Sequence, residues 1–330
     1  MYKILTITIP SYNTSQYIDS CLPTFLSNKK ILKDIEILII NDGSKDDTLV
    51  KAKYYENKYP ETIKVVDKEN GGHGSTINSG IKLASGKYFK IVDGDDWVDN
   101  NNFTNLVQQL KKIDTDMVVN PYVEYNERKK SENVVIAENK YNGNVSFDDL
   151  SLNEAIPMHS ITYRTSILKD NRIHIDENAF YVDVEYILFP IPFVDNIYFF
   201  DFPVYVYRYD TPSQSVSTKN TQRNVLHHLK VVRSVISFYD TLPINISVEK
   251  KSYILSRMIK LINTQYNIYF SFPLSKSIKE KLAVFDNELK TKHPSIYNSH
   301  GYNPFVKIFR CKNEFYYFVW ILNQIRLKLK

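Results

Sequence analysis

The sequence predicts an α/β fold that is followed by a mainly helical C-terminal region. Two observations indicate the α/β part. Short β-branched segments alternate with helical patterns over the first 100 residues, and seven of the nine glycines lie between Gly43 and Gly94. Alternation of this kind is typical of a parallel sheet covered by helices. The helical part is indicated by apolar residues that recur at helical spacing from about residue 222 onward.

Four strands and three helices account for the first 100 residues. A buried parallel strand is expected to be apolar almost throughout, as in Ile35 to Ile40. Acidic side chains favour a helix N-terminus, as at Asp46 and Asp47. The expected strands are 4–9, 35–40, 63–66 and 88–92, and the expected helices are 17–25, 46–59 and 75–84.

The pattern is less regular after residue 100. We expect a helix over 103–113, strands over 117–120 and 122–125, and a surface loop over the polar segment 127–145. We therefore predict one domain over 1–221, in halves of 1–100 and 101–221, and a helical region over 222–330.

Composition excludes several classes of protein. Cys21 and Cys311 match no disulfide or metal pattern, which favours a reducing compartment. The first residues lack the features of a signal peptide, and the apolar run Phe315 to Leu322 is too short to span a membrane. Residues 301–330 carry the whole net charge of +5. We therefore expect a cytoplasmic protein without a general nucleic-acid surface and with no nucleic acid among its partners.

Polar residues and glycines follow each of the four strands. Ligands of parallel α/β sheets bind at the carboxyl ends of the strands, so these segments are expected to line one crevice. Asp93-Gly94-Asp95-Asp96 crowds three carboxylates that repel one another, and a hard divalent cation would neutralise them. An acidic turn that caps the next helix is the alternative. The four segments are 10–13, 41–44, 70–74 and 93–97.

The turn Asn70-Gly71-Gly72-His73-Gly74 precedes a predicted helix. Such a turn exposes backbone N–H groups to an anion such as phosphate, and a merely flexible turn is the alternative. A dinucleotide-binding fingerprint would place its glycines after the first strand. Because Pro10-Ser11-Tyr12-Asn13 stands there, the sequence argues against a nicotinamide-dependent enzyme.

Taken in order, the four segments resemble the family-2 glycosyltransferases of the GT-A fold. These are inverting enzymes that use nucleotide-diphosphate sugars and a divalent metal. The likeness is close over 4–100 and looser over 150–220. It implies a Rossmann-like, nucleotide-sugar-binding domain with a mixed central sheet, a donor-binding half over 1–100 and an acceptor half over 101–221. It also implies Mn²⁺ or Mg²⁺ as cofactor.

The resemblance implies roles for individual residues at the donor site. Tyr12 would lie near the base, and Asp42 would accept a hydrogen bond from a ring N–H, as suits uracil. Asp95, in an Asp-x-Asp pattern, would be the principal metal ligand, and Asp93 would face the ribose or the metal. The implied donor-binding residues are Pro10, Tyr12, Asn13, Asp42, Asn70, Gly71, Gly72, His73, Asp93, Gly94, Asp96 and Arg208, and the metal ligands are Asp95 and Asp93.

The catalytic base is expected in a later segment. Phe180 to Tyr186 resembles the acidic motif of the family, which aligns Asp183 with the base. A base is needed because the acceptor hydroxyl loses its proton as it attacks the anomeric carbon. Capping a helix or pairing with a cation is the alternative role. Met158, His159 and Glu185 would contact the sugar or the acceptor, with Glu185 as the reserve base.

Two positions depart from the pattern of the family. Ile77 stands where an arginine usually precedes the asparagine equivalent to Asn78, and Val182 stands in place of an acid before the base. Residues 207–209 and 213–217 resemble a loop of the family that closes over the diphosphate. We expect Arg208 in this loop to supply the missing cation. A surface arginine stacked on tyrosines is the alternative.

The C-terminal segment is aromatic and then basic. Phe315 to Leu322 is followed by Arg326, Lys328 and Lys330. This composition suits a helix at an anionic membrane surface, a helix packed on a second copy of the chain, or a helix docked on its own domain. Peripheral contact with the inner face of the cell membrane and homo-oligomerisation through this region therefore both stay open.

The sequence predicts metal-dependent, inverting transfer of a sugar from a UDP-sugar to a hydroxyl of a glycan acceptor. The acceptor would be carried on lipid, polymer or protein, in the synthesis of bacterial surface polysaccharide, teichoic acid or glycoprotein glycan. One alternative is a nucleotidyltransferase, which would normally carry a basic glycine-rich loop after the first strand. The other is a non-catalytic sugar-nucleotide or glycan-binding protein, against which the presence of Asp93, Asp95 and Asp183 argues.

Overall fold

The computed structural model divides into two compact units, Met1–Ser213 and Gln214–Lys330, and each is described by itself. The boundary predicted between residues 221 and 222 falls within helix α7 (Thr218–Arg223). The structure describes residues 3–136, 141–152, 156–209, 217–311 and 315–328.

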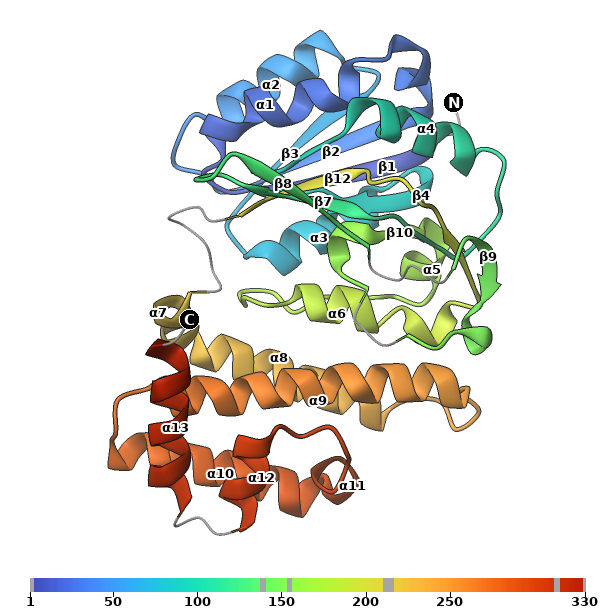
Figure 1. Cartoon of the computed structure of the whole chain (residues 1–330). Helices are drawn as coiled ribbons and strands as arrows, with labels where there is room; N and C mark the ends of the chain where they lie inside the picture. The colour runs from blue at the N-terminus through green and yellow to red at the C-terminus, as the bar shows by residue number, and fades with distance from the viewer. Residues whose placement is uncertain (1–2, 137–140, 153–155, 210–216, 312–314, 329–330) are drawn as a thin grey trace. The chain divides into compact units, whose positions relative to one another are not determined.

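The first unit is built on a mixed eight-stranded sheet (Figure 1). Strands β1 to β4 run parallel to one another, while β10 runs antiparallel to both β4 and β6. The predicted α/β fold with a mixed sheet is therefore confirmed. In spatial order the strands are β3 (Ile63–Lys68), β2 (Ile35–Asp42), β1 (Lys3–Ser11), β4 (Gly86–Ile91), β10 (Ile161–Arg164), β6 (Met117–Val119), β11 (Asn196–Phe199) and β9 (Gly143–Ser146).

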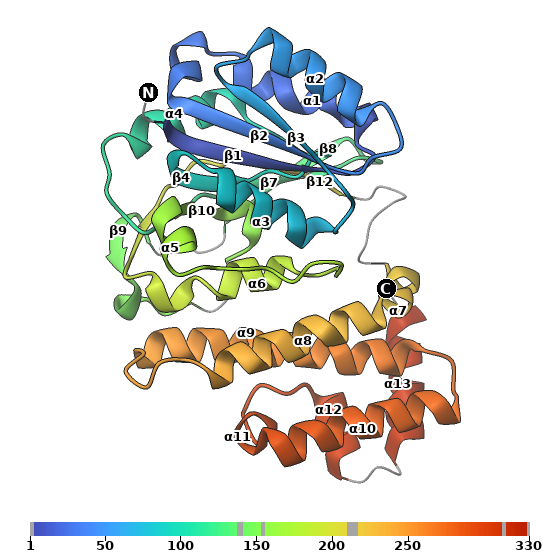
Figure 2. The ribbon, with the colours of Figure 1, turned by 180° about the vertical axis from the view of Figure 1, so that it is seen from behind.

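Helices cover both faces of this sheet. Figure 1 and, from behind, Figure 2 show one group of helices above the strands and another group below them. The two faces are therefore shielded from water, which explains why the central strands are apolar on both sides. The upper group is α1 (Ser15–Leu26), α2 (Thr48–Lys58) and α4 (Asn100–Leu110), and the lower group is α3 (His73–Leu83), α5 (Thr165–Asp170) and α6 (Asp183–Leu188).

The two faces of β1 meet different partners. Leu5, Ile7 and Ile9 belong to the hydrophobic core that α1 and α4 close, with Phe25 and Phe103 in edge-to-face contact. The intervening Thr6 and Thr8 are also fully buried. They face the other layer, where a Cβ at Gly80 of α3 would overlap the side chain of Thr8. This close approach seats α3 against the sheet, with its N-terminus at the carboxyl ends of the strands.

A second sheet of four strands completes the first unit. Its order is β5 (Trp97–Val98), β12 (Tyr205–Tyr209), β7 (Tyr122–Asn126) and β8 (Ser131–Val135). The prediction of a loop over 127–145 was wrong, because β8 pairs with β7 as an antiparallel hairpin and β9 joins the main sheet. The side chains of β8 are mostly exposed, so its polar sequence carried no sign of a strand.

The second unit is helical, as predicted. Side-chain oxygens of Ser247 and Ser275 cap the N-termini of its two longest helices by accepting from Lys250 N and Ile278 N. Among the described residues, no helix is long and apolar enough to cross a membrane. Besides α7, the helices are α8 (Val225–Asp240), α9 (Val248–Ser271), α10 (Lys276–Lys292), α11 (Pro294–Tyr297), α12 (Pro304–Cys311) and α13 (Tyr316–Lys328).

Candidate active site

The four strand-end segments meet at the carboxyl edge of the parallel strands, as predicted. Three hydrogen bonds join them: Gly94 N donates to Pro10 O (3.1 Å), Asn13 N to Ser44 Oγ (3.0 Å), and Asn70 Nδ2 to Asp42 O (2.8 Å). Gly94 is needed at this junction, because a Cβ there would come within 2.8 Å of Pro10 O. The segments therefore form one continuous polar site.

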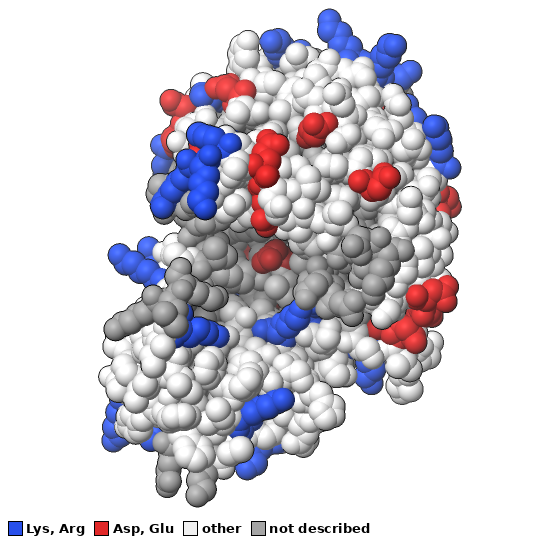
Figure 3. All heavy atoms as spheres, viewed as in Figure 1, with Lys and Arg blue, Asp and Glu red and all other residues white. Residues whose placement is uncertain are grey.

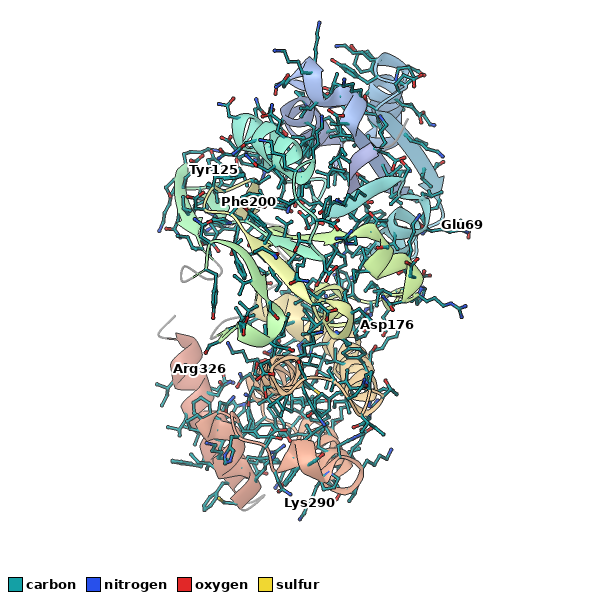
Figure 4. All side chains as sticks on the ribbon, turned by 90° about the vertical axis from the view of Figure 1, so that its right-hand side faces the viewer. Glu69, Tyr125, Asp176, Phe200, Lys290 and Arg326 are labelled. Carbon is teal, nitrogen blue, oxygen red and sulfur yellow. The ribbon has the colours of Figure 1, made fainter. Side chains whose placement is uncertain are left out.

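A cleft of about 580 Å³ opens over the ends of β2 and β3. Tyr12 is half exposed and lines it together with Asn70. Contact of these two residues with a nucleoside stays a prediction. Both signs of charge lie around the cleft. In Figure 4, Glu69 of the cleft and Tyr125 of the smaller sheet lie on opposite sides of the first unit. The lining residues are Tyr12, Asn41, Gly43, Ser44, Lys45, Leu49, Asp67, Lys68, Glu69 and Asn70.

Asp42 lies beneath this cleft and does not line it. Its carboxylate accepts hydrogen bonds from Gly71 N (2.9 Å) and Gly72 N (2.8 Å), and it pairs with Lys68 Nζ at 2.8 Å. The residue is only 2% exposed. Asp42 therefore holds the glycine turn in place, and it occupies two of the N–H groups that were expected to face a phosphate. Its contact with a base stays a prediction.

Asp67 is a residue of the cleft that sequence reasoning missed. Its carboxylate lines the cleft and accepts a hydrogen bond from Asn41 Nδ2 (2.7 Å). The two side chains meet because Asn41 of β2 is the register partner of Asp67 of β3. A polar residue near the end of a strand, such as Asp67, is a possible sign of a ligand site. Its place in the cleft depends on the pairing of β3 with β2, which the local sequence does not specify.

Three carboxylates crowd the turn after β4. Asp93 Oδ1 lies 2.9 Å from His73 Nε2, while Asp96 accepts from Tyr205 Oη (2.5 Å) and from Arg208 N (2.8 Å). Burial, reinforced by Asp95 and Asp93, raises the pKa of Asp96 well above its usual range. Burial and Asp93 raise the pKa of Asp95 to about 6. Burial also opposes ionisation of Asp93, but His73 outweighs it and lowers the pKa of Asp93.

The cluster has donors that fit a divalent cation. One ligand atom from each of Asp93, Asp96 and His159 lies within 4.8 Å of the other two. Among the described residues, the Nδ1 atom of His159 is buried without a hydrogen-bond partner. Asp95, which was expected to be the principal ligand, is not a member of this group of three. Two carboxylates and an imidazole are a suitable donor set for a cation that accepts both oxygen and nitrogen.

His159 sits on a short 3₁₀ turn, Met158–Ser160, beside three tyrosines. Its ring stacks on Tyr207 (centroids 4.5 Å apart, planes at 25°) and contacts Tyr205 at 4.7 Å. Its carbonyl oxygen accepts from the buried Lys90 Nζ (2.8 Å). Burial lowers the pKa of His159 to about 4, so the imidazole is neutral near pH 7. Met158 is buried in the core beside it.

Asp183 begins helix α6 and lies close enough to His73 for the two charges to interact. Burial raises the pKa of Asp183, although His73 opposes the shift. The pKa of His73 is itself raised, because the effects of Asp93 and Asp183 outweigh that of burial. His73 therefore lies between the carboxylate cluster and the predicted base, and the structure brings all three into one site.

Glu185 is fully buried, and its carboxylate accepts a hydrogen bond from the backbone. Its Oε2 accepts from Asp176 N (2.7 Å), the residue labelled in Figure 4. Two residues further on, Asn178 N donates to Gly71 O (2.6 Å). Glu185 thus holds the segment that ties α6 to the glycine turn, and its contact with an acceptor stays a prediction.

Arg208 is held beside the carboxylate cluster. Its Nε donates to Asp95 O (2.9 Å), its Nη1 to Glu127 Oε2 (2.6 Å), and its guanidinium lies over Trp97 (4.6 Å to the ring centroid). These contacts fix the side chain and pair its charge with Glu127. The loop expected to close over the diphosphate includes residues 210–216, which lie outside the described part of the chain.

The family model "Glycosyl transferase family 2" matches residues 6–170. The chain therefore belongs to this family, and its first unit carries the glycosyltransferase domain. The match includes all four strand-end segments in full, and with them the Asp93 to Asp96 cluster. Asp183 and Arg208 lie beyond it.

Curated relatives of the chain are bacterial proteins. The chain is 36% identical over 118 residues to the "Uncharacterized glycosyltransferase EpsJ" of Bacillus subtilis, covering 36% of this chain and 33% of the relative. It is 30% identical over 180 residues to the "Minor teichoic acid biosynthesis protein GgaB" of B. subtilis, covering 53% and 19%. The aligned parts thus span less than half of these relatives' own length.

Solved structures share the fold. TarS 1–349 of S. aureus, crystallised with UDP-GlcNAc, has a TM-score of 0.56 and 20% identity, covering 89% of this chain and 78% of that one. The mannosyltransferase PcManGT of Pyrobaculum calidifontis, in complex with GDP-Man and Mn²⁺, has a TM-score of 0.51 and 13% identity, covering 92% and 85%. These similarities confirm the GT-A type of α/β fold.

Proposed function

We propose that this chain transfers a sugar from a UDP-sugar to a hydroxyl group of a glycan acceptor, with inversion and with the help of a divalent cation. The acceptor would belong to bacterial surface polysaccharide, teichoic acid or a glycoprotein glycan. The observation that carries the proposal is the arrangement of the crowded carboxylates Asp93 to Asp96 and the candidate base Asp183 around His73. The cleft opens at the same edge of the sheet, over the ends of β2 and β3.

The nucleoside of the donor is assigned to the cleft. Tyr12 offers an exposed aromatic ring on which a base can stack. The carboxylate of Asp67 is a hydrogen-bond acceptor in the cleft, and a uracil ring carries an N–H that needs one. We therefore regard Asp67, alongside Asp42, as a candidate reader of the base.

The reacting end of the donor is assigned to the space beside Asp93, Asp95 and Asp96. A divalent cation bound there supplies positive charge to the departing diphosphate. Asp93 is oriented for this role by His73, and Asp96 by Tyr205 and Arg208 N. The second carboxylate site, at Asp183, accepts the proton of the attacking hydroxyl. Its raised pKa brings it closer to the value at which a general base is most effective near pH 7.

Names of similar proteins support the choice of donor and setting. TarS has been crystallised with UDP-GlcNAc and with UDP, and GgaB is named for teichoic acid biosynthesis. The Mn²⁺ of the PcManGT complex supports a metal-dependent reaction.

The proposal is tested by UDP release from a panel of UDP-sugars, measured with and without Mn²⁺. We expect release from at least one donor, and only with the cation present. Asp183→Asn should retain donor binding and lose at least about a hundredfold in turnover, because a general base is worth that much. Failure to bind any nucleotide sugar would overturn the proposal, and a fully active Asp183→Asn would overturn the role of the base.

For the second unit we propose peripheral contact with an anionic membrane surface through α13. Trp320 Nε1 donates to Phe272 O (2.7 Å) and Tyr316 is buried, so one face of α13 docks on its own unit. The side chains of Tyr317, Phe318 and Ile321 are about half exposed and precede the basic C-terminal residues.

Flotation of the chain with vesicles containing anionic lipid tests this contact. The double change Phe318→Ser and Ile321→Ser should reduce flotation several-fold, because it removes exposed apolar area while leaving the docked face intact. Val284→Ser, an exposed apolar residue of α10, is the control. Unchanged flotation of the double variant would contradict the membrane contact, and self-association lost in the same variant would favour a second copy instead.

A further inference from the structure

We propose that His159 is a nitrogen ligand of the divalent cation and completes a donor set with Asp93 and Asp96. The inference rests on the proposed function and makes it more specific, because it names the residues that hold the metal and the metal they prefer. The resemblance to the family had instead assigned Asp95 as the principal ligand and His159 to the acceptor.

The first argument is distance. The chain brings His159 to Asp93 and Asp96 because β10, which follows its 3₁₀ turn, pairs with β4, which precedes the two carboxylates. As a result, one ligand atom from each of the three residues lies within 4.8 Å of the others. The two carboxylates and the imidazole are therefore close enough to bind the same ion.

The second argument is the state of the imidazole. His159 Nδ1 is buried and has no hydrogen-bond partner among the described residues. Burying a polar atom without a hydrogen-bond partner makes folding less favourable. We therefore infer that Nδ1 finds its partner in a bound ligand. The ring cannot easily turn away to find another one, because it stacks on Tyr207 and also contacts Tyr205 and Tyr122.

The third argument is that both carboxylates are already oriented. Tyr205 Oη donates to Asp96 Oδ2 and accepts from Asp93 N, so one hydroxyl holds both residues. Asp96 Oδ1 accepts from Arg208 N, and Asp93 Oδ1 meets His73 Nε2. Contacts of this kind orient the ligands of protein metal sites before the ion binds. Tyr205 thus contacts His159 with its aromatic ring and forms hydrogen bonds to both aspartates with its hydroxyl.

The donor set implies a preference among metals. Mg²⁺ favours oxygen ligands, whereas imidazole favours transition-metal ions. A site with two carboxylates and one imidazole should therefore bind Mn²⁺ more tightly than Mg²⁺. Replacing the imidazole by an amide, which offers oxygen, should reduce that preference.

The experiment is pulsed electron paramagnetic resonance of Mn²⁺ bound to the full chain, with and without UDP. We expect ¹⁴N modulation from a directly bound imidazole, and its replacement by a ¹⁵N signal when the protein is labelled with ¹⁵N-histidine. His159→Gln should abolish the modulation, weaken Mn²⁺ binding by about tenfold or more, and lower the ratio of Mn²⁺ to Mg²⁺ affinity.

Two histidine variants are the controls. His73→Gln removes the histidine that contacts Asp93 and should retain the ¹⁴N modulation. His174→Gln changes an exposed histidine and should alter nothing. Because the labelling experiment uses the wild-type chain, a variant that fails to fold does not leave the question open.

The outcomes separate this inference from the proposed function. Mn²⁺ that binds to the wild type without ¹⁴N modulation, or modulation that survives in His159→Gln, would overturn the role of His159 and leave the glycosyltransferase proposal standing. The same holds if Asp95→Asn abolishes Mn²⁺ binding while His159→Gln does not. No Mn²⁺ binding with or without UDP would overturn both.

Discussion

In the described part of the chain, a buried tyrosine donates to a buried aspartate in each of the two units, and the two pairs differ in what surrounds them. In the first unit Tyr205 donates to Asp96 at 2.5 Å, and in the second Tyr266 donates to Asp286 at the same distance. Asp286 also accepts from Arg310 Nε (3.1 Å). Asp96 has Asp93 and Asp95 as neighbours instead, and both raise its pKa.

The two pairs therefore differ in how the negative charge of the buried carboxylate is balanced. The guanidinium of Arg310 lies between Tyr297 and Tyr302, at 3.8 and 3.9 Å from their ring centroids, so the protein itself supplies the balancing charge. Near Asp96, the backbone N–H of Arg208 donates to the carboxylate, but its guanidinium contacts Glu127 and a backbone carbonyl. The first arrangement stabilises a helical unit, and the second leaves a place for a cation that arrives from outside.

Figure 3 gives the surface context of this comparison. Acidic and basic side chains are mixed over the face that it shows, so the surface by itself does not single out the site. What distinguishes the two carboxylates is the pairing of charges beneath the surface.

The largest effect on stability should follow from breaking the balanced pair. Arg310→Met leaves Asp286 buried without its cation, which should lower the free energy of unfolding by about 3–5 kcal/mol. Urea denaturation monitored by circular dichroism measures the loss. The exposed ion pair of Arg233 with Glu288 offers a matched control, and Arg233→Met should cost less than about 1 kcal/mol. If both variants lost the same free energy of unfolding, Arg310 would not balance a buried charge as we propose.

The unbalanced cluster should respond in the opposite direction. Asp95→Asn relieves repulsion among three carboxylates, so the metal-free variant should be about 1 kcal/mol more stable than the wild type near pH 8. Thermal unfolding in the presence of a chelator measures the difference. Asp99→Asn, at the N-cap of α4, is a control that should not stabilise the chain. A less stable Asp95→Asn would show that the protein already balances the cluster.

The pH dependence of that difference should be no larger than the difference itself. The pKa of Asp95 is about 6 in the folded chain, against an ordinary value of 3.8. Between these values the folded state binds a proton that the unfolded state does not, so the wild type gains stability as the pH falls from 6 towards 4. Asp95→Asn lacks this gain. Its advantage should be full above pH 6 and disappear near pH 4, and a difference that is constant over this range would contradict the assignment.

The sequence predicted the strands and turns of residues 1–100 well because their signals are local. Strands such as Ile35 to Ile40 and the turns that follow them are each recognisable without knowledge of the rest of the chain. The strand ends of a parallel sheet must then meet at one edge, so the convergence of Pro10, Asp42, Asn70 and Asp93 could be predicted too.

The parts that were missed depend on contacts between distant residues. β8 is polar because its side chains are exposed, and only its pairing with β7 identifies it as a strand. Asp67 enters the cleft through its register with Asn41, and His159 reaches Asp96 through the pairing of β10 with β4. Asp42 accepts the glycine N–H groups because of how β2 faces α3, which no local pattern specifies.

The central claim is that the crowded carboxylates of the first unit are a place for a cation that binds together with a nucleotide. Isothermal titration of UDP into the chain, with Mn²⁺ and with a chelator, tests it most directly. We predict tight binding only with Mn²⁺, and loss of that dependence in Asp96→Asn but not in Arg310→Lys. UDP affinity that is the same with and without Mn²⁺ would contradict the claim.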